Sequence, residues 1–334
     1  MKAVVLVGGF GTRLRPLTAT TPKQMLPVVD RPIIEYVLST LERGGVSEVT
    51  LALGYKEDLF RAAYPDAVCG GVSLSYAVEP EPLDTAGAVR FAADAAGLDE
   101  SFLVVNGDVL TDIDVRSLWE RHHETGAQAT IALTRVDDPT RFGVVPTDSQ
   151  GRVLGFVEKP CREEAPTNWV NAGVYVLEPE IPGRIAGDRR VSIEREVFPA
   201  VAAENGLWAV KSEAYWIDIG TPSTYVQAQL DLIDGVRGAA MAAVAADAHV
   251  AEHAGVDRSV VMDGASVAAG AVVRDSIIMQ GALIDEGALV DGSIIGPGAR
   301  VGTGAKVTGM SIVGDRMSVE PGRLVDGSKI PMGD

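Results

Sequence analysis

The sequence predicts an α/β fold with a mixed, mostly parallel sheet, followed by a parallel β-helix. Up to about residue 232, short runs rich in Val, Leu and Ile alternate with segments whose apolar residues recur every three or four positions. Beyond residue 246, Val or Ile recurs at six-residue steps instead. This change of period predicts two domains, residues 1–232 and 247–334, joined by residues 233–246.

The first domain contains strand candidates that are short, apolar and rich in β-branched residues, at 2–7, 48–53, 73–78, 101–106 and 129–134. Helical patterns lie between and beside them, at 33–43, 56–63, 86–96 and 115–124. Such alternation predicts parallel strands covered by helices on both faces. Ligands of such sheets bind beyond the C-terminal ends of the strands. The glycine-rich residues that follow the first strand, called the glycine loop below, should therefore lie at this ligand-binding edge.

The connecting stretch GVRGAAMAAVAA, residues 235–246, is dominated by small side chains. This bias suits a short linker helix. An Ala-rich helix packed on one of the domains fits the same composition.

The second domain shows a regular apolar repeat of two six-residue steps and one five-residue step. The repeat predicts coils of seventeen residues, with these Val and Ile side chains pointing inward: 244, 250, 256, 261, 267, 273, 278, 284, 290, 295, 301 and 307. Ile312 or Val313, then Val319 and Val325, fit a fifth, looser coil. Hexapeptide repeats of this kind resemble the left-handed β-helix family.

The composition excludes several classes of partner. The net charge is -17, which disfavours nucleic acid and anionic membrane surfaces. The apolar runs are too short to span a bilayer, and the N-terminal residues do not read as a signal peptide. Cys69 and Cys161 show no metal-binding spacing, so a reducing cytoplasmic location is expected.

The stretch LVGGFGTRLRPLTATTPK, residues 6–23, is the first candidate for ligand binding. Its glycines allow backbone N–H groups to approach an anion closely. It is neither a Walker loop nor a GxGxxG motif, because the Gly-Lys-Ser/Thr run is missing and Leu14 stands at the third glycine position. Arg13 and Lys23 add two cations, which suit a triphosphate and a leaving pyrophosphate.

This stretch resembles the signature of the sugar-phosphate nucleotidylyltransferases, also called NDP-sugar pyrophosphorylases. Later segments agree with that signature in order: EPLDTAG (81–87), NGDV (106–109), FGVV (142–145), FVEKP (156–160), NAGVY (171–175) and WIDIGTP (216–222). The resemblance covers essentially the whole chain and is greatest for the GDP-mannose pyrophosphorylase branch. It implies a Rossmann-like catalytic domain, a left-handed β-helix tail, and the substrates GTP and mannose-1-phosphate.

The resemblance also implies the roles of individual residues. It places Asp108 and Asp218 on a Mg²⁺ ion, whose preference for oxygen ligands fits two carboxylates. It implies a catalytic set of Arg13, Lys23, Asp108, Lys159 and Asp218. It implies nucleotide contacts from Val7, Gly8, Gly9, Gly11, Thr12, Arg13, Lys23, Glu81, Thr85, Ala86, Gly87, Asn106, Gly107 and Asp108. It implies sugar-phosphate contacts from Gly143, Glu158, Lys159, Asn171 and Asp218.

The expected reaction is attack of a sugar-1-phosphate oxygen on the α-phosphorus of a nucleoside triphosphate. Because a phosphate monoester is already anionic, positioning and charge neutralisation should supply most of the catalysis. Adjacent His122 and His123, on a polar helix, are expected to be solvated.

The choice of base rests on the segment VEPEPLDTAG, residues 78–87. A carboxylate can accept both donors on the edge of guanine, so Glu79 or Glu81 favours GTP, with Glu81 preferred. Asp84 stands where the family usually has glycine, and PKQMLPV (22–28) is closer to the thymidylyltransferase branch. A glucose-1-phosphate thymidylyl- or uridylyltransferase therefore stays open as an alternative.

Two further alternatives concern the class of protein. A catalytically silent regulatory paralogue would need a broken site, yet every catalytic residue implied above is present. An acyltransferase tail would need a catalytic His on the coils, where His249 and His253 lie only at the first coil. We therefore expect the tail to be structural, joining copies of the chain into a homo-oligomer, a dimer or tetramer.

Overall fold

The computed structural model describes residues 1–54, 56–187 and 189–331. The chain divides into two compact units, which are described separately. Unit 1 comprises Met1–Gly9 and Ile34–Trp216, and unit 2 comprises Phe10–Ile33 and the chain from Ile217 onward. The boundary between them therefore falls within the glycine loop. The last three residues of the domain predicted at 247–334 lie outside the described residues.

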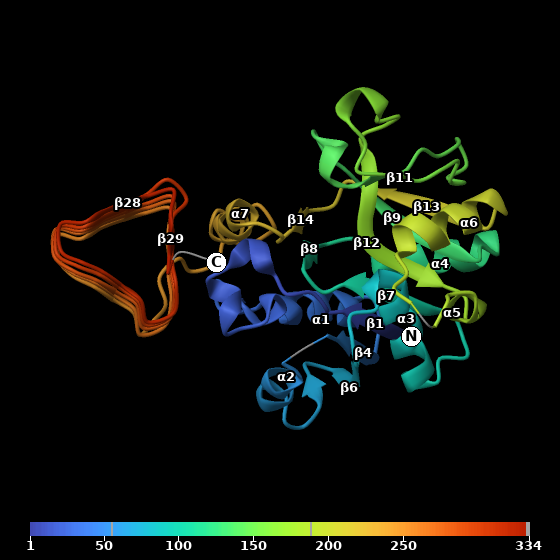
Figure 1. Ribbon diagram of the computed structural model, residues 1–334, viewed down its shortest axis with the longest axis horizontal. Helices are drawn as coiled ribbons and strands as arrows, with labels where there is room; N and C mark the ends of the chain where they lie inside the picture. The colour runs from blue at the N-terminus through green and yellow to red at the C-terminus, as the bar shows by residue number, and fades with distance from the viewer. Residues whose placement is uncertain (55, 188, 332–334) are drawn as a thin grey trace. The chain divides into compact units, whose positions relative to one another are not determined.

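Unit 1 is built on a mixed sheet, seen with its helices in Figure 1. Its main path runs β11 (Val157–Glu158), β10 (Gly143–Val144), β12 (Trp169–Leu177), β7 (Phe102–Asn106), β1 (Lys2–Leu6), β4 (Glu48–Leu53), β6 (Val72–Val78) and β5 (Val68–Cys69). Two further strands, β9 (Ala129–Arg135) and β13 (Leu207–Ser212), extend the sheet beside β12. The short strand β8 (Val109–Thr111) also lies in this unit.

The centre of this sheet is parallel, as the sequence predicts. Strand β1 pairs in parallel with both β4 and β7, and β4 pairs in parallel with β6. Most residues of β1, β4 and β7 are buried, which explains why they read as continuous apolar runs. Because β1 lies between β4 and β7, Gly8 and Asp108 both follow strand ends at one edge of the sheet.

The helices of unit 1 are α1 (Ile33–Arg43), α2 (Glu57–Ala63), α3 (Asp84–Ala96), α4 (Val115–Thr125), α5 (Glu180–Gly183) and α6 (Phe198–Ala203). Their ends follow local chemistry. Helix α4 begins after Asp114, whose carboxylate accepts a hydrogen bond from the N–H of Ser117 at 3.0 Å. Gly126 follows the helix in the left-handed conformation that ends many helices.

Unit 2 contains a three-sided parallel β-helix, the triangle of stacked strands in Figure 1. One side is formed by β15 (His249–Val250), β18 (Ser266–Val267), β21 (Leu283–Ile284), β24 (Arg300–Val301) and β27 (Ser318–Val319). The second is formed by β16 (Gly255–Asp257), β19 (Val272–Arg274), β22 (Leu289–Asp291), β25 (Lys306–Thr308) and β28 (Leu324–Asp326). The third is formed by β17 (Val260–Val261), β20 (Ile277–Ile278), β23 (Ile294–Ile295), β26 (Ile312–Val313) and β29 (Lys329–Ile330).

The predicted inward positions form the core of the β-helix, with two differences. The Val and Ile side chains from Val261 to Val307 at the predicted positions are at most 1% exposed. The start of the repeat differs, because Val244 is 37% exposed and Val250 and Val256 are half-buried. In the looser coil, Val313 rather than Ile312 pairs with the inward Ile295. That coil has one residue more, and Met310 there has a φ of 60°, a left-handed conformation.

A ladder of buried serines connects successive coils along one corner of the β-helix. The hydroxyl oxygens of Ser259, Ser276, Ser293 and Ser311 each accept a backbone N–H from the serine of the next coil. Each serine hydroxyl also donates to a carbonyl of its own turn. The ladder therefore satisfies polar backbone groups that the apolar core could not.

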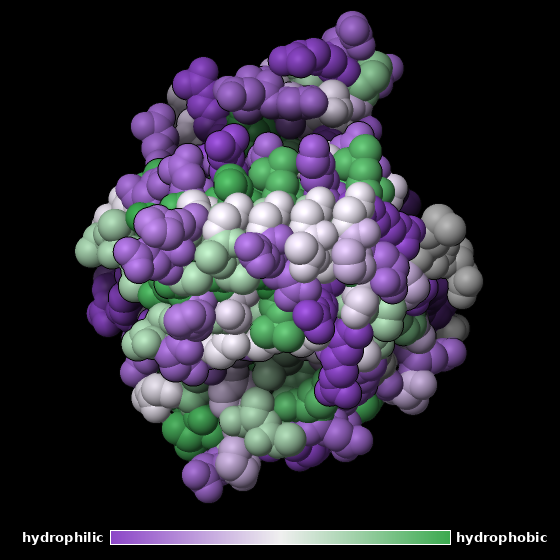
Figure 2. Space-filling model, turned by 90° about the vertical axis from the view of Figure 1, so that its left-hand side faces the viewer, coloured by the Kyte–Doolittle hydropathy of each residue, from purple (hydrophilic) through white to green (hydrophobic). Residues whose placement is uncertain are grey.

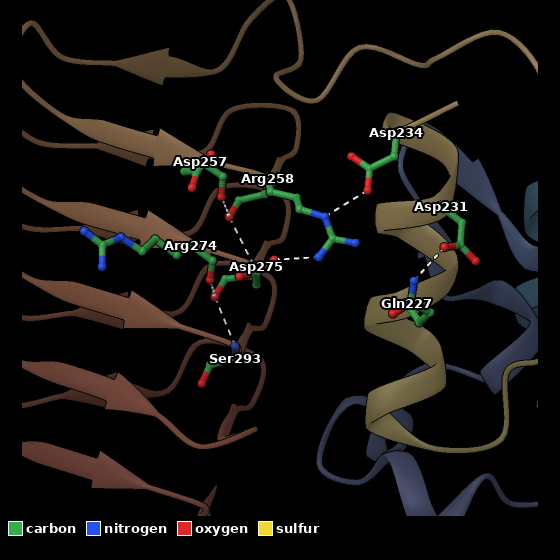
Figure 3. A network of polar contacts seen from close by, with 10 residues as sticks. Gln227, Asp231, Asp234, Asp257, Arg258, Arg274, Asp275 and Ser293 are labelled. Atoms are coloured by element: carbon green, nitrogen blue, oxygen red, sulfur yellow. Dashed lines mark hydrogen bonds and ion pairs between the residues drawn. The ribbon is translucent and has the colours of Figure 1, made fainter. Parts of the chain in front are cut away.

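The prediction of a linker helix between residues 233 and 246 is wrong. Helix α7 (Pro222–Ile233) ends at Ile233, and residues 234–246 form turns and extended chain. Gly235 and Gly238 have positive φ values of 74° and 142°. A right-handed helix cannot contain such residues, so these two glycines prevent a helix although the alanines favour one. Figure 3 shows the ion pairs formed where the chain leaves α7. Arg258 contacts Asp234, just after α7, and Asp275, on the next coil.

Apolar side chains on the outside of the β-helix are scattered. Leu283 and Leu324 are 40% and 64% exposed and belong to different sides of the β-helix. The surface in Figure 2 accordingly shows polar and apolar residues interspersed over one face. Among the described residues, no helix is both long enough and apolar enough to cross a membrane.

Candidate functional site

In unit 1, Gly8 and Gly9 of the first motif follow the end of strand β1, and Gly107 follows the end of β7. Gly9 has a φ of 105°, which a residue with a side chain would adopt only with strain. Gly107 donates its N–H to the carbonyl of Leu6 at 2.9 Å. A Cβ at Gly107 would lie 2.7 Å from Val7 Cγ1, so glycine is required there for close packing of β1 against the turn after β7.

Two carboxylates of the VEPEP segment differ in their surroundings. Glu79 is buried, lies beside Gly8 and accepts a hydrogen bond from the N–H of Leu83 at 3.0 Å. Burial raises the pKa of Glu79, and the hydrogen bond from Leu83 offsets only part of that rise. Glu81, which the sequence analysis prefers as the base-reading residue, is exposed.

Asp84 adopts the conformation that the family glycine would favour. Its φ is 63°, in the left-handed region, and its carboxylate accepts a hydrogen bond from the N–H of Thr85 at 2.8 Å. Aspartate tolerates this region better than most residues because of such local hydrogen bonds. Asp84 therefore combines a left-handed backbone with a side chain that a glycine would lack.

Thr85, Ala86 and Gly87, which follow Asp84, make hydrogen bonds to other residues of unit 1. The N–H groups of Ala86 and Gly87 both point to the carbonyl of Val191, at 2.9 and 3.3 Å. Thr85 donates its hydroxyl to Glu194 at 2.9 Å and accepts the N–H of Ile193. These contacts anchor the N-terminal end of α3.

The EKP motif is organised by a short antiparallel pair of strands. Gly143 on β10 lies opposite Glu158 on β11, and a Cβ at Gly143 would lie 2.4 Å from the ring of Phe156. Lys159 donates its ammonium to Glu158 with 2.6 Å between Nζ and Oε1. The Glu158 side chain is 17% exposed and that of Lys159 is 57% exposed, so the cation stays accessible.

Asn171 lies at an irregularity in β12, where the pairing with β9 shifts between Asn171 and Tyr175. Its amide nitrogen donates to the Tyr175 hydroxyl at 2.8 Å, and its amide oxygen accepts the N–H of Gly173 at 3.0 Å. Nearby, the indole of Trp216 donates to the carbonyl of Ala172.

Tyr175 joins the candidate residues of unit 1. Burial raises its pKa well above the ordinary value, so the hydroxyl stays protonated at neutral pH. Carboxylates act in the same direction, Glu194 most and then Glu158 and Asp108. The sheet brings the EKP motif and Asn171 near each other, because strands β11 and β12 both pair with β10.

In unit 2, the remainder of the glycine loop folds as short 3-10 turns, at Thr12–Leu14, Leu17–Ala19 and Lys23–Met25. Gly11 has a φ of 57°, and a Cβ there would lie 3.0 Å from Thr18 and 3.3 Å from Lys23. The hydroxyl of Thr18 donates to the carbonyl of Gly11 at 2.8 Å. Lys23 is only 6% exposed, whereas Thr12 and Arg13 are exposed.

Arg13 and Asp218 both lie beside Gly220. A Cβ at Gly220 would lie 2.8 Å from Arg13 Nη2 and 3.0 Å from Asp218 Oδ1. Asp218 is the last residue of β14 (Trp216–Asp218), two residues before this glycine. The structure therefore brings one predicted cation and one predicted metal ligand together through a residue that carries no side chain.

Helix α7 holds the segment between Phe10 and Ile33 from the other end of the chain. Thr221 and Thr224 form a reciprocal capping pair, with Pro222 at the first helical position. Within the helix, buried Gln229 accepts the N–H of Val29 at 3.1 Å, and the hydroxyl of Tyr225 donates to the carbonyl of Pro27. These contacts support β2 (Pro27–Val28) and β3 (Arg31–Pro32).

Three residues of this site are not among the sequence predictions: Tyr175, Gly220 and Lys329. Tyr175 and Gly220 stand inside the quoted motifs NAGVY and WIDIGTP, so the motifs contain a signal for both. Lys329, which donates to the carbonyl of Arg13, lies in the last described coil and carries no such signal.

The glycine loop, the cations and the carboxylates after strand ends belong to an α/β protein whose central strands are parallel. The chain belongs to the nucleotidyl transferase family, whose family model matches residues 2–235. A second family model, the GMPPB C-terminal domain, matches residues 239–332.

Similar proteins include the mannose-1-phosphate guanylyltransferase of Mycobacterium tuberculosis (strain ATCC 25618 / H37Rv). It is 42% identical over 238 residues, which cover 70% of this chain and 65% of that protein. The probable mannose-1-phosphate guanylyltransferase 1 of Oryza sativa subsp. japonica is 40% identical over 254 residues, covering 75% of this chain and 70% of that protein. The alignment thus spans just under two thirds of the mycobacterial relative.

Among solved structures, HddC from Yersinia pseudotuberculosis is similar, with 29% identity and a TM-score of 0.59. The match covers 68% of this chain and 97% of that one. A second structure of HddC, complexed with GMP-PN, gives a TM-score of 0.58.

Proposed function

We propose that the protein transfers a guanylyl group from GTP to mannose-1-phosphate, giving GDP-mannose and pyrophosphate. The grouping of Glu158, Lys159 and Asn171 around strand β10 carries the proposal, because it offers hydrogen-bond acceptors for sugar hydroxyls and a cation for the sugar phosphate. The names of the mycobacterial and rice relatives support the choice of GTP and mannose-1-phosphate.

The residues of the first motif have complementary tasks. Arg13 offers a planar guanidinium fork and Lys23 an ammonium, and both suit the β- and γ-phosphates that leave as pyrophosphate. Gly8, Gly9 and Gly11 leave room for a phosphate close to the backbone, which fits the positive φ values of Gly9 and Gly11.

The donor types also fit a divalent metal ion. Asp108 and Asp218 are half-buried carboxylates, the first lying two residues beyond the buried strand β7 and the second at the end of the half-buried strand β14. Carboxylate oxygens are ligands that Mg²⁺ prefers. We propose that these two aspartates hold Mg²⁺, which when bound would neutralise phosphate charge. The same two residues would also orient the sugar phosphate.

The transfer step needs no general base. A non-bridging oxygen of mannose-1-phosphate forms a bond to the α-phosphorus while the bond from that phosphorus to the β-bridging oxygen breaks. Pyrophosphate leaves with the electron pair of that bond. Lys159 holds the attacking phosphate in line, and the cations of the first motif stabilise the charge that develops on the leaving group.

The guanine edge is proposed to be read by a carboxylate of residues 78–87. Glu81 is exposed and therefore accessible to a base, whereas Glu79 is buried with a partner. Replacing Glu81 by Gln should reduce the use of GTP more than that of dTTP, because guanine presents two donors to one acceptor group. Equal losses would assign base reading elsewhere.

One assay tests the proposal as a whole. Pyrophosphate release is measured over five nucleoside triphosphates against several hexose-1-phosphates, with and without Mg²⁺. GTP with mannose-1-phosphate and Mg²⁺ should give the highest kcat/KM. A maximum with dTTP or UTP and glucose-1-phosphate would favour the alternative branch, and no release at all would favour a silent paralogue. Association of copies through the β-helix stays a prediction.

A further inference from the structure

A second polar cluster of unit 1 lies on α4 and the segment after β12. The expectation that His122 and His123 are both solvated is wrong for His122, whose side chain is 0% exposed. Its ring nitrogen Nε2 lies 2.7 Å from Glu178 Oε1, and Nδ1 lies 2.9 Å from Thr130 Oγ1. The ring of His123 has its centroid 5.4 Å from that of His122 and is exposed.

These side chains line a hollow of about 690 Å³. Glu180 and Ser101 also line it, so two carboxylates face the hollow. Arg184, a further lining residue, donates to Gln128 and forms an ion pair with Glu204. Its charge is therefore engaged by a carboxylate outside the cluster.

We propose that His122, His123 and Glu178 bind one divalent transition-metal ion, Zn²⁺ by their donor types. One ligand atom from each residue lies within 4.8 Å of the others. Two ligands of a tetrahedral Zn²⁺ with bonds of 2.0–2.2 Å are about 3.3 Å apart. The exposed ring of His123 can rotate to shorten the ligand-to-ligand distances from up to 4.8 Å toward that value. A water molecule can then fill the fourth position.

The surroundings of His122 match those of a metal ligand. Its ring is buried, and each ring nitrogen lies within hydrogen-bond distance of a side-chain oxygen, so its neighbours fix the ring's orientation. A neutral ring that carries its proton on Nδ1 donates it to the hydroxyl of Thr130, which leaves Nε2 for the metal. In the metal-free protein, the contact with Glu178 occupies Nε2 instead.

Glu178 is prepared for the same role. The Ser101 hydroxyl donates a hydrogen bond to Glu178 Oε1 at 2.7 Å, and the same oxygen lies 2.7 Å from His122 Nε2, so the carboxylate is oriented toward the histidines. Imidazole nitrogens select Zn²⁺ over Mg²⁺, which prefers all-oxygen sites. The site would fasten α4 to the segment between β12 and α5, away from the residues of the proposed reaction.

The test measures Zn²⁺ affinity in the full chain, after chelator treatment and without nucleotide, by competition with a chromophoric chelator. Wild type should bind one Zn²⁺ per chain, and His123→Ala and Glu178→Gln should each weaken binding by at least ~10-fold. Thr130→Val should weaken it by ~10–100-fold, as loss of an outer-shell partner does. Zn²⁺ should also raise the Tm of wild type and leave that of His123→Ala unchanged.

Two controls separate this site from others. His253 is an exposed histidine beside Glu252, with 4.0 Å between Nε2 and Oε1, so His253→Ala removes a similar pair and should bind Zn²⁺ as wild type does. The Asp108→Asn, Asp218→Asn double variant should also retain Zn²⁺ binding. Loss of binding in either control, or unchanged affinity in both His123→Ala and Glu178→Gln, would overturn the proposal.

Discussion

Lys329 donates a hydrogen bond to the backbone carbonyl of Arg13, with 3.0 Å between Nζ and O, across 316 positions of the sequence. Next to this contact, a Cβ at Gly314 would lie 2.9 Å from the ring of Pro16. The last described coils of the β-helix therefore pack directly on the segment that carries Arg13. Since that segment is proposed to hold the leaving group, we expect the tail to help position it as well as to stabilise the fold.

Replacing Lys329 by Met should lower kcat/KM by about 10-fold, because one hydrogen bond to a charged group contributes roughly 1.5 kcal/mol in a partly exposed place. Lys306→Met, at an exposed position of β25, is the matched control and should keep full activity. The kinetics are measured together with thermal unfolding. A Tm loss without any kinetic change would reduce the contact to a purely structural one.

Gly220→Ala should lower kcat/KM by ~10–100-fold while changing the Tm little. The added methyl group would meet the mobile end of Arg13, which can move away at small energetic cost but then leaves its productive position. Gly183→Ala in α5, where a Cβ meets nothing within 4 Å, serves as the control. Full activity of Gly220→Ala would remove Arg13 from the list of positioned cations.

Substitutions of Asp84 should separate backbone strain from side-chain contacts. Asp84→Ala keeps a left-handed φ on a residue with a Cβ and loses the hydrogen bond from Thr85, so it should destabilise the protein by ~1 kcal/mol or more. Asp84→Gly removes the strain and should lie within about 0.5 kcal/mol of wild type. Urea unfolding checks the order, and an Asp84→Ala variant as stable as Asp84→Gly would contradict it.

Glu79 should give stability a specific pH dependence. Because burial raises its pKa, the folded state binds the proton more tightly than the unfolded state. Stability contributed by this group is therefore present below the ordinary carboxyl pKa and is lost as pH rises through the raised value. Glu79→Gln keeps an acceptor for Leu83 and cannot ionise, so it should be more stable than wild type at neutral pH.

This advantage should shrink as pH falls below the ordinary carboxyl pKa. Unfolding in urea is measured from pH 4 to pH 8 for Glu79→Gln, with Glu81→Gln as the control for removing an exposed charge nearby. A difference between Glu79→Gln and wild type that stays constant across the series would show that burial of the charge is not its cause.

Much of the fold can be predicted from the sequence because its signals are local. The runs at 48–53 and 129–134 lie within strands β4 and β9. The apolar repeat predicts the inward residues of the β-helix because each side of a coil is one short strand, and equivalent residues of successive coils pair with each other. The linker at 235–246 was mispredicted because alanine content favours a helix, whereas two glycines with positive φ decide the backbone.

The candidate site is less predictable because it depends on distant contacts. Val115, Leu118 and His122 recur at helical spacing and are buried on one face of α4. The position of His122 in this pattern indicates burial, whereas the polarity of its side chain favours exposure to solvent. No local pattern indicates that Lys329 reaches Arg13 or that Gln229 reaches Val29. Such pairs are set by the tertiary fold.

The membership of residues 10–33 in unit 2 has a consequence for biosynthesis. These residues leave the ribosome early, but Gln229 and Lys329, which hold them, are made some two hundred to three hundred residues later. At 5–20 residues per second, the loop waits roughly 15–60 s for its last partner. The arginine that is proposed to contact the leaving phosphates therefore gains its contact with Lys329 only after that residue has been made, when the sheet of unit 1 can already have formed.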